Sequence, residues 1–197
     1  MIALSGPLTL KVDRSDPRFI ALAQANIRLS KSDGEIWGAE AAVEARHRLN
    51  WIDLPNTSRT LLPELDALAA KFRSRSRVIL CGMGGSSLAP EVIAATFSKE
   101  LFILDSTDPG YIARALSSDL FQTVVVVSSK SGSTLETASQ RALFEARFTA
   151  AGLLPTEHMV IVTDPDSPLD LDARARGFTT INADAQVGGR FSALSAF

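Results

Sequence analysis

An apolar run that enters a glycine-rich turn is the feature of this sequence that most restricts its fold. Residues 78–81 read Val-Ile-Leu-Cys, residues 82–87 read Gly-Met-Gly-Gly-Ser-Ser, and apolar residues then recur at helical spacing from Leu88 to Phe97. An unbroken apolar run bounded by turn residues predicts a strand buried on both faces. We place Pro90 in the first turn of the helix, where its missing N–H is harmless. A strand, a glycine turn and a helix start direct backbone N–H groups and the helix dipole at an anion, so this stretch predicts a phosphate pocket.

The chain from residue 77 onward alternates between short apolar runs and helical stretches. We expect strands at 78–81, 101–104, 123–127, 159–162 and 179–181, and helices at 88–97, 111–116, 135–150 and 169–176. This alternation predicts an α/β fold with a doubly wound, mostly parallel five-stranded sheet covered on both faces. In such sheets ligands bind beyond the carboxyl ends of the strands, where the strand order reverses.

The first 76 residues have a different pattern and are expected to form an N-terminal helical extension. Asp16 and Pro17 predict the start of a helix that runs to about Leu29. The expected buried side of this helix consists of Phe19, Ile20, Leu22, Ala23 and Ile27. Because these residues recur at helical spacing, we expect them to face the rest of the molecule.

Further helices of the extension are expected at 39–49 and 61–72. Trp37 and Trp51 flank the first of these and are expected to anchor it to the main domain. The charged residues around His47, including Glu44 and Arg48, are expected to form a solvated helix face.

The predicted division of the chain has three parts. Residues 1–76 are the extension, residues 77–187 are the α/β domain, and residues 188–197 begin a further segment. The last residues are apolar and carry neither a cap nor a polar tail. We therefore expect a fragment of a longer protein.

Composition argues against several classes of protein. The 197 residues carry a formal net charge of -2, so no basic excess suggests a nucleic-acid partner and any anion site must be local. No apolar stretch has the length of a membrane span, and the N-terminus lacks a signal-peptide pattern. The single cysteine, Cys81, closes a predicted strand and is expected to be a buried structural residue in a reducing compartment. We expect a cytoplasmic protein with no nucleic-acid or membrane partner.

A hydroxyl-rich loop follows the third predicted strand. Residues 128–134 read Ser-Ser-Lys-Ser-Gly-Ser-Thr and lead into a long predicted helix. Hydroxyl groups at a helix start suit a phosphate, because they donate to its oxygens. The alternative is helix capping, with Ser133 as the cap and Glu136 closing a capping box. Capping leaves four side chains of the loop unexplained: Ser129, Lys130, Ser131 and Thr134. We therefore favour phosphate binding.

The first glycine turn has two competing interpretations besides a phosphate pocket. Glycine is sometimes needed for the geometry of a tight turn alone. A dinucleotide fingerprint is the other alternative, because Asp105 stands where a ribose-binding acid is expected. That fingerprint has glycine at the position that Ser87 occupies here, however, and a dinucleotide-binding fold does not require the hydroxyl-rich second loop. We favour a phosphate held by the backbone of Gly84 and Gly85 and by the Ser86 hydroxyl.

Together these motifs resemble a known family. Residues 82–87 and 129–137 resemble the two phosphate-loop segments of sugar isomerase domains, and the match is closer to glucose-6-phosphate isomerase than to the wider group. Residues 187–192, Val-Gly-Gly-Arg-Phe-Ser, resemble the Gly-Gly-Arg signature of that family. Residues 82–91, followed by residues 105–109, are similar to bacterial forms and to the isomerase half of transaldolase–isomerase fusions. Residues 49–55 also resemble the isomerase half of those fusions. The resemblance covers about residues 49–197.

The resemblance implies roles for individual residues. The positions that match the sugar-phosphate ligands of the family are Gly84, Gly85, Ser86, Ser129, Lys130, Ser131 and Thr134. Arg190 matches the arginine beside the enediolate intermediate. The general-base Glu, the ring-opening His and a late Lys of the family are expected beyond residue 197, and His158 is not given the role of that His.

The implied reaction interconverts glucose 6-phosphate and fructose 6-phosphate through a cis-enediol. This is acid–base chemistry, for which no metal or redox cofactor is expected. The chain is then the sugar-phosphate-binding N-terminal fragment of such an isomerase, inactive without its base. The alternative is a non-catalytic regulatory module that uses the same loops, against which the Gly-Gly-Arg segment argues. For the parent, both a homodimer and a fusion to a transaldolase domain are left open.

Overall fold

The fold is taken from a computed structural model of the chain, which describes residues 6, 13–117 and 119–197. The start of the predicted N-terminal extension lies outside the described residues. Five strands form one sheet in the order β2-β1-β3-β4-β5, and every neighbouring pair is parallel. The strands are β1 (Arg77–Gly82), β2 (Phe102–Leu104), β3 (Thr123–Ser128), β4 (Met159–Thr163) and β5 (Thr179–Asn182). All five predicted strands are confirmed.

The strand order reverses between β1 and β3. The chain leaves β1 for β2 on one side, returns to β3 on the other side of β1, and continues outward through β4 to β5. In the register, Cys81 lies opposite Leu104 of β2 and opposite Val127 of β3. The carboxyl ends of β1 and β3 are therefore neighbours at the point where the fold class predicts a ligand site.

Helices connect the strands and precede the sheet. The α-helices are α1 (Pro17–Ser30), α2 (Ala39–Ala45), α3 (Leu54–Thr57), α4 (Leu62–Lys71), α5 (Gly85–Thr96), α6 (Pro109–Leu116), α7 (Leu135–Ala150), α8 (Pro155–His158) and α9 (Pro168–Ala175). Short 3-10 helices add η2 (Gly34–Trp37), η3 (Asn50–Asp53), η4 (Ser58–Leu61), η5 (Leu120–Gln122) and η6 (Gly189–Leu194). The doubly wound α/β class is confirmed, and α7 has the predicted bounds.

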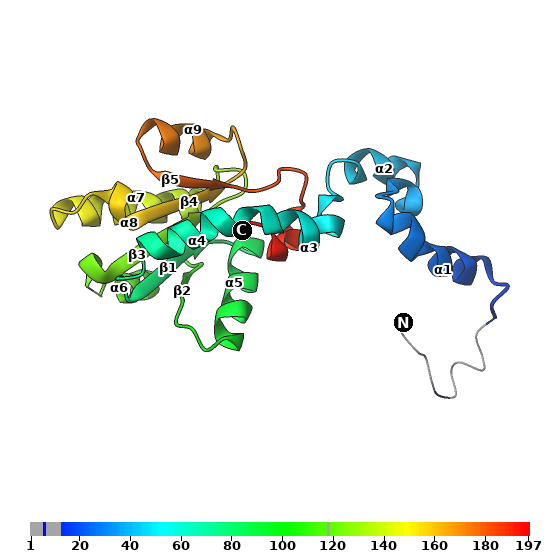
Figure 1. The fold of residues 1–197 in the computed structure, drawn as a ribbon, viewed down its shortest axis with the longest axis horizontal. Helices are drawn as coiled ribbons and strands as arrows, with labels where there is room; N and C mark the ends of the chain where they lie inside the picture. The colour runs from blue at the N-terminus through cyan, green and yellow to red at the C-terminus, as the bar shows by residue number, and fades with distance from the viewer. Residues whose placement is uncertain (1–5, 7–12, 118) are drawn as a thin grey trace.

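Helices lie on both sides of the sheet (Figure 1), and an apolar layer covers each of its two faces. Alternate strand residues point to opposite faces, so Val125 belongs to one layer and Val124 to the other. On the first face α6, α7 and α9 pack against the strands, and complete burial of Phe144 and Phe148 contributes about 1.5–3 kcal/mol each. On the second face the layer includes Leu68, from α4, as well as residues of the C-terminal segment.

The N-terminal extension only partly follows its prediction. Asp16 caps α1 as expected, accepting a hydrogen bond from the Arg18 N–H. The predicted buried side of α1 is wrong: it has no buried residue, and Leu22 and Ile27 are 74% and 56% exposed. The reason is that α1 and α2 stand apart from the sheet, as Figure 1 shows, so the apolar stripe of α1 has no partner there. The segment predicted as one helix at 39–49 ends as α2 at Ala45.

The two tryptophans of the extension have different roles. The ring of Trp51 stacks on Phe191 with centroids 5.0 Å apart, so it anchors the extension as predicted. Trp37 is 52% exposed, and its predicted anchoring role is wrong. Cys81 is fully buried, and burial raises the pKa of its thiol well above the ordinary value, which fits the predicted structural role. Within the part of the chain that the structure describes, every helix is too short or too polar to cross a membrane.

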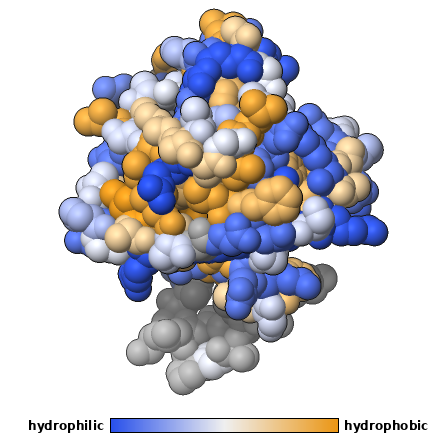
Figure 2. Space-filling view, turned by 90° about the vertical axis from the view of Figure 1, so that its left-hand side faces the viewer, coloured by the Kyte–Doolittle hydropathy of each residue, from blue (hydrophilic) through white to orange (hydrophobic). Residues whose placement is uncertain are grey.

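The two ends of the sheet present different surfaces. Figure 2 looks onto the end that lies on the left in Figure 1, where apolar side chains gather at the surface among charged ones. Phe121, just before β3, is 56% exposed, and the Arg75 guanidinium lies 4.7 Å from the centre of its ring. This is the amino end of the strands. The polar motifs predicted from the sequence lie at the other end.

Candidate functional site

A cavity of about 830 Å³ opens at the carboxyl ends of β1, β3 and β4. The predicted site residues that line it are Gly85, Ser86, Ser129, Lys130, Ser131, Thr134 and Arg190. Gly84 is not part of the lining but directly precedes it, as the N-cap residue of α5. The structure therefore brings together three motifs that are spread over more than 100 residues of the chain.

The first wall of the cavity is the N-terminus of α5. The helix begins at Gly85, so Ser86 lies in its first turn and faces the cavity. Gly84 has φ +59°, which favours glycine, and no side chain caps the helix. The prediction for Pro90 is wrong, because the helix starts earlier than expected and Pro90 lies in its second turn. The N–H groups of Ser86 and Ser87 already donate to the carbonyls of Met83 and Gly84, at 3.3 and 3.1 Å. The Gly85 N–H and the positive end of the helix dipole remain available to an anion.

The details of this turn do not favour a dinucleotide. Ser87 stands where the fingerprint wants glycine, and its buried hydroxyl donates to the Gly84 carbonyl at 3.0 Å. Asp105 is exposed and does not line the cavity. Ser87 thus remains a mismatch to the fingerprint, and Asp105, on which the dinucleotide alternative depended, lies outside the cavity.

The second wall is the N-terminus of α7. Thr134 has the extended backbone of an N-cap residue, yet no side chain caps this helix either. The predicted capping box is therefore wrong. Ser133 lies one residue too early, and its hydroxyl pairs at 2.9 Å with that of Ser131. The Ser129 hydroxyl donates to Thr134 Oγ1 at 3.4 Å, so the hydroxyls of the loop lie close together.

Hydrogen bonds to β4 hold the β3–α7 loop in place. The Ser129 N–H donates to the Val162 carbonyl at 3.0 Å, and the Asp164 N–H donates to the Lys130 carbonyl at 3.2 Å. The Lys130 ammonium donates to both oxygens of Asp164, at 2.9 and 2.8 Å, and to the Ala185 carbonyl at 3.1 Å. Lys130 thus lines the cavity, but its charge is already paired.

Glycine is required where this loop meets α9. Gly132 has φ +70°, and a Cβ on it would lie 2.6 Å from the Cβ of Leu169. Both the backbone conformation and the close approach therefore exclude other side chains. The loop is fixed from both sides, by β4 and by α9.

Arg190 is the cation of the cavity that has no partner. Of the three cations in the lining, Lys130 pairs with Asp164 and Arg48 pairs with Glu44, whereas Arg190 makes no hydrogen bond or ion pair to any described residue. Its segment rests against α5, because a Cβ on Gly85 would overlap the Gly189 carbonyl oxygen. An unpaired guanidinium beside two open helix starts makes the cavity suited to an anion.

Several lining residues were not among the predicted site residues, including Ser128, Asp164, Glu44 and Arg48. Ser128, at the end of β3, is 2% exposed and lines the cavity, yet its hydroxyl has no hydrogen-bond partner among the described residues. A hydroxyl that closes an apolar strand, directly before the loop, was the available signal. Glu44 and Arg48 were expected on a solvated face, but they also line the cavity. Nothing local in the sequence indicates this, because the contact comes from distant parts of the chain.

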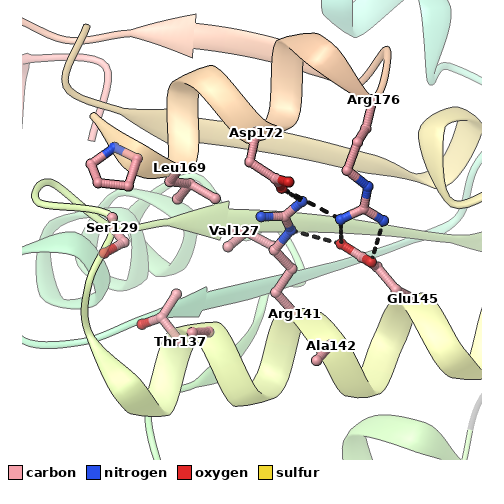
Figure 3. Close-up of a pocket in the computed structure, with 12 residues that line it drawn as sticks. Val127, Ser129, Thr137, Arg141, Ala142, Glu145, Leu169, Asp172 and Arg176 are labelled. Atoms are coloured by element: carbon pink, nitrogen blue, oxygen red, sulfur yellow. Dashed lines mark hydrogen bonds and ion pairs between the residues drawn. The ribbon is translucent and has the colours of Figure 1, made fainter. Parts of the chain in front are cut away.

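A smaller cavity of about 260 Å³ lies between α7 and α9 (Figure 3). Four charged residues surround it, and each is paired: Arg141 with Glu145 at 2.7 Å and with Asp172 at 2.6 Å, and Arg176 with the same two carboxylates. The hydrogen bond from Arg141, with the positive charges of both arginines, holds the pKa of Asp172 below its ordinary value. This network joins the two helices and leaves no free charge for a ligand.

Known proteins resemble this chain in sequence and structure. No protein-family model matches it. It is 36% identical over 163 residues to a glucose-6-phosphate isomerase of Chlamydia trachomatis serovar L2, covering 79% of this chain and 29% of that protein. It is also 36% identical over 157 residues to a glucose-6-phosphate isomerase of Thermus thermophilus, covering 75% and 37%. The crystal structure of a glucose-6-phosphate isomerase from Chlamydia trachomatis D/UW-3/Cx superposes with a TM-score of 0.66 at 28% identity, covering 93% and 41%. The chain thus spans about a third of the length of the curated relatives that it matches.

Proposed function

This chain is homologous to one part of the glucose-6-phosphate isomerases, and from that premise we propose that it forms the phosphate-binding part of a sugar-phosphate isomerase. The observation that carries the proposal is the convergence of two uncapped helix N-termini on one cavity. Each helix start stabilises a nearby anion by about 0.3–1 kcal/mol, and more when partly buried. The unpaired Ser128 hydroxyl and the unpaired Arg190 supply further donors.

The proposed phosphate position is between α5 and α7. Its ligands are the backbone at Gly85 and the hydroxyls of Ser86, Ser129, Ser131 and Thr134. In this proposal Gly84 shapes the turn, and Lys130 holds the loop through Asp164 rather than contacting the phosphate. The ion pair supports this assignment for Lys130, since a contact from its ammonium to the phosphate would break the pair with Asp164.

The proposed reaction interconverts glucose 6-phosphate and fructose 6-phosphate through a cis-enediol. The phosphate serves as a remote handle, and the energy of binding it orients the reacting carbon atoms. In this proposal Arg190, which lines the cavity, stabilises the negative charge that develops on the enediolate oxygens. We assign the general base and the ring-opening acid to the longer polypeptide, because the relatives extend well beyond the matched part. We place the reaction in the cytoplasm, in keeping with a single buried cysteine.

Calorimetric titration with fructose 6-phosphate, inorganic phosphate and NAD tests the binding proposal. We expect saturable binding of fructose 6-phosphate, competition by inorganic phosphate, and no binding of NAD. Ser129→Ala should weaken the binding of both phosphate ligands by about 10- to 100-fold, since a hydrogen bond to a charged group is worth about 1.5–3 kcal/mol. Ser117→Ala is the matched control, because Ser117 is exposed and lies outside the cavity. Saturable NAD binding without a response to phosphate would overturn the proposal.

A coupled assay for the formation of fructose 6-phosphate tests the proposed catalytic reaction. We expect no turnover from the 197-residue chain alone, because a missing general base costs about 10²–10⁴-fold. In a full-length parent enzyme, Arg190→Ala should lower kcat far more than it raises KM, and Arg190→Lys should recover only part. Turnover by the chain alone, above contamination, would place a base within this sequence. A fully active Arg190→Ala parent would remove the role of the guanidinium.

A further inference from the structure

The N-terminal extension supplies part of the cavity wall. Glu44, on α2, and Arg48, just after it, line the same cavity as the phosphate loops. Their side chains form an ion pair, with Arg48 Nε 2.7 Å from Glu44 Oε1. The two side chains are 47% and 71% exposed, so their remaining donors and acceptors are open to a ligand.

Three contacts fix this part of the extension to the segment that carries Arg190. Leu49 forms an antiparallel bridge with Val187, and both residues are buried. The Asn50 side-chain amide donates to Asp184 at 2.6 Å, and the ring of Trp51 stacks on Phe191. As a result Arg48 lies over Gly188, where an added Cβ would be 4.0 Å from Arg48 Cδ.

The size of the cavity leaves room beside a phosphate. A water molecule occupies about 30 Å³ in the liquid, so a cavity of about 830 Å³ exceeds the needs of a phosphate group many times over. With the phosphate between α5 and α7, the rest of a ligand extends along the cavity. The Glu44–Arg48 pair is then among the groups that it meets.

The chemistry of the pair suits hydroxyl groups rather than a second anion. A carboxylate accepts hydrogen bonds from two hydroxyls, and a guanidinium donates several in a planar fork. Because the two charges cancel, the pair adds little to the attraction for a phosphate. Resting on the function proposed above, we propose that Glu44 and Arg48 are specificity-determining residues that recognise the hydroxyl groups of the sugar phosphate.

A charge-balanced double variant tests this inference. Glu44→Gln combined with Arg48→Gln removes the ionic pair without changing the net charge of the protein. We expect its affinity for fructose 6-phosphate, measured by calorimetry, to fall about tenfold. The affinity for inorganic phosphate should stay within about twofold, because that ligand does not reach the pair. Glu40→Gln combined with Arg46→Gln is the matched control, since both residues are exposed and neither lines the cavity.

The possible outcomes separate this inference from the proposed function. Unchanged binding of both ligands by the double variant would show that the pair only forms a solvated helix face, and would overturn the proposal. An equal loss for both ligands would mean that the variant distorts the phosphate loops, and would overturn hydroxyl recognition. If the unaltered chain binds neither ligand, the proposed function fails, and this inference with it. A loss confined to fructose 6-phosphate, with the control variant unchanged, supports the assignment.

Discussion

In the described part of this molecule, four α-helices directly follow strands of the same parallel sheet, and side chains cap the N-termini of two of them but not of the other two. In α6, the Asp108 carboxylate accepts a hydrogen bond from the Tyr111 N–H at 2.7 Å, and in α9 the Ser167 hydroxyl accepts one from the Asp170 N–H at 3.0 Å. In α5 and α7 no side chain performs this task. A missing cap costs about 1 kcal/mol of stability, so the two open helix starts are places where the chain gives up stability.

The location of the open helix starts explains the difference. They follow β1 and β3, which are neighbours at the reversal of strand order, and both face the larger cavity. The capped helices follow β2 and β4. A strand followed by a helix N-terminus thus occurs at four positions. At two of them a side-chain cap stabilises the helix, and at the other two the N-terminus is left without a cap beside the cavity. Departures from local optimisation that cluster in one cavity are typical of a functional site.

Of the changes proposed here, adding a methyl group at Gly85 should have the largest effect on the uncapped helix α5 and on phosphate binding. A Cβ there would overlap the Gly189 carbonyl oxygen, so α5 and the Arg190 segment must separate. We expect Gly85→Ala to lower the free energy of unfolding by about 1–3 kcal/mol and to abolish phosphate binding. Chemical denaturation and calorimetry measure the two effects.

Gly110→Ala, in the first turn of the capped helix α6, is the control for this substitution. Its added Cβ would meet only a side-chain oxygen of Asp108, at 3.2 Å, and the change should cost less than about 1 kcal/mol. A Gly85→Ala variant as stable as the unaltered chain, with normal phosphate binding, would show that the close approach is unimportant.

Adding a side-chain cap at the start of α7 should make this helix more stable and less able to bind phosphate. Thr134 already has the backbone conformation of an N-cap residue, so Thr134→Asp should keep or raise stability by up to about 1 kcal/mol. The same carboxylate occupies the anion position and repels phosphate, and affinity should fall by more than about tenfold. Thr134→Asn, a neutral cap, should give a smaller loss, which separates repulsion from occupancy. If Thr134→Asp binds phosphate normally, the start of α7 is not the anion site.

Opening a capped helix should affect stability alone. Asp108→Ala removes the cap of α6, and we expect a loss of about 1 kcal/mol in the free energy of unfolding. Phosphate affinity should not change, because Asp108 lies outside the cavity. Thr134→Ala should do the opposite, weakening phosphate while changing stability little. Equal behaviour of the two variants in both measurements would remove the distinction between capped and open helices.

The stability of the capped helix α9 should depend on pH through Asp170, which lies in its first turn. Burial raises the pKa of this carboxyl, but hydrogen bonds from Asn182, the Asp166 N–H and Arg174 outweigh it, and the pKa lies below its ordinary value. The carboxylate therefore contributes stability above its unfolded pKa of about 3.9, and this is lost as the pH falls through the folded pKa. Denaturation of Asp170→Asn between neutral and acid pH should show a shallower loss than the unaltered chain. An identical pH dependence would contradict the assignment.

The sheet and its helices were predictable because their signals are local. β-branched residues in short runs indicate buried strands, as in the four consecutive valines that lead to Val127, and residues 135–150 have the length and spacing of a helix. The apolar stripe of α1 was misread, since periodicity predicts a helix but does not reveal whether a partner covers it. Leu22 remains exposed for this reason.

The site was only partly predictable for a different reason. Strand ends and hydroxyl-rich loops indicated where Ser86, Ser129 and Thr134 would meet, because parallel strands end at one edge of the sheet. Their individual roles in binding remain predictions. The pairing of Lys130 with Asp164 and the arrival of Arg48 depend on contacts between distant segments, which no local pattern encodes.

The most direct test of the comparison is a nuclear magnetic resonance titration of the ¹⁵N-labelled chain with inorganic phosphate. Amide resonances in the first turns of α5 and α7, at Gly85, Ser86 and Leu135, should shift saturably together. Those near the starts of α6 and α9, such as Gly110 and Leu171, should remain in place, because their helix starts are capped. Shifts of equal size at all four helix starts, or none at α5 and α7, would contradict a phosphate site built from the two open helices.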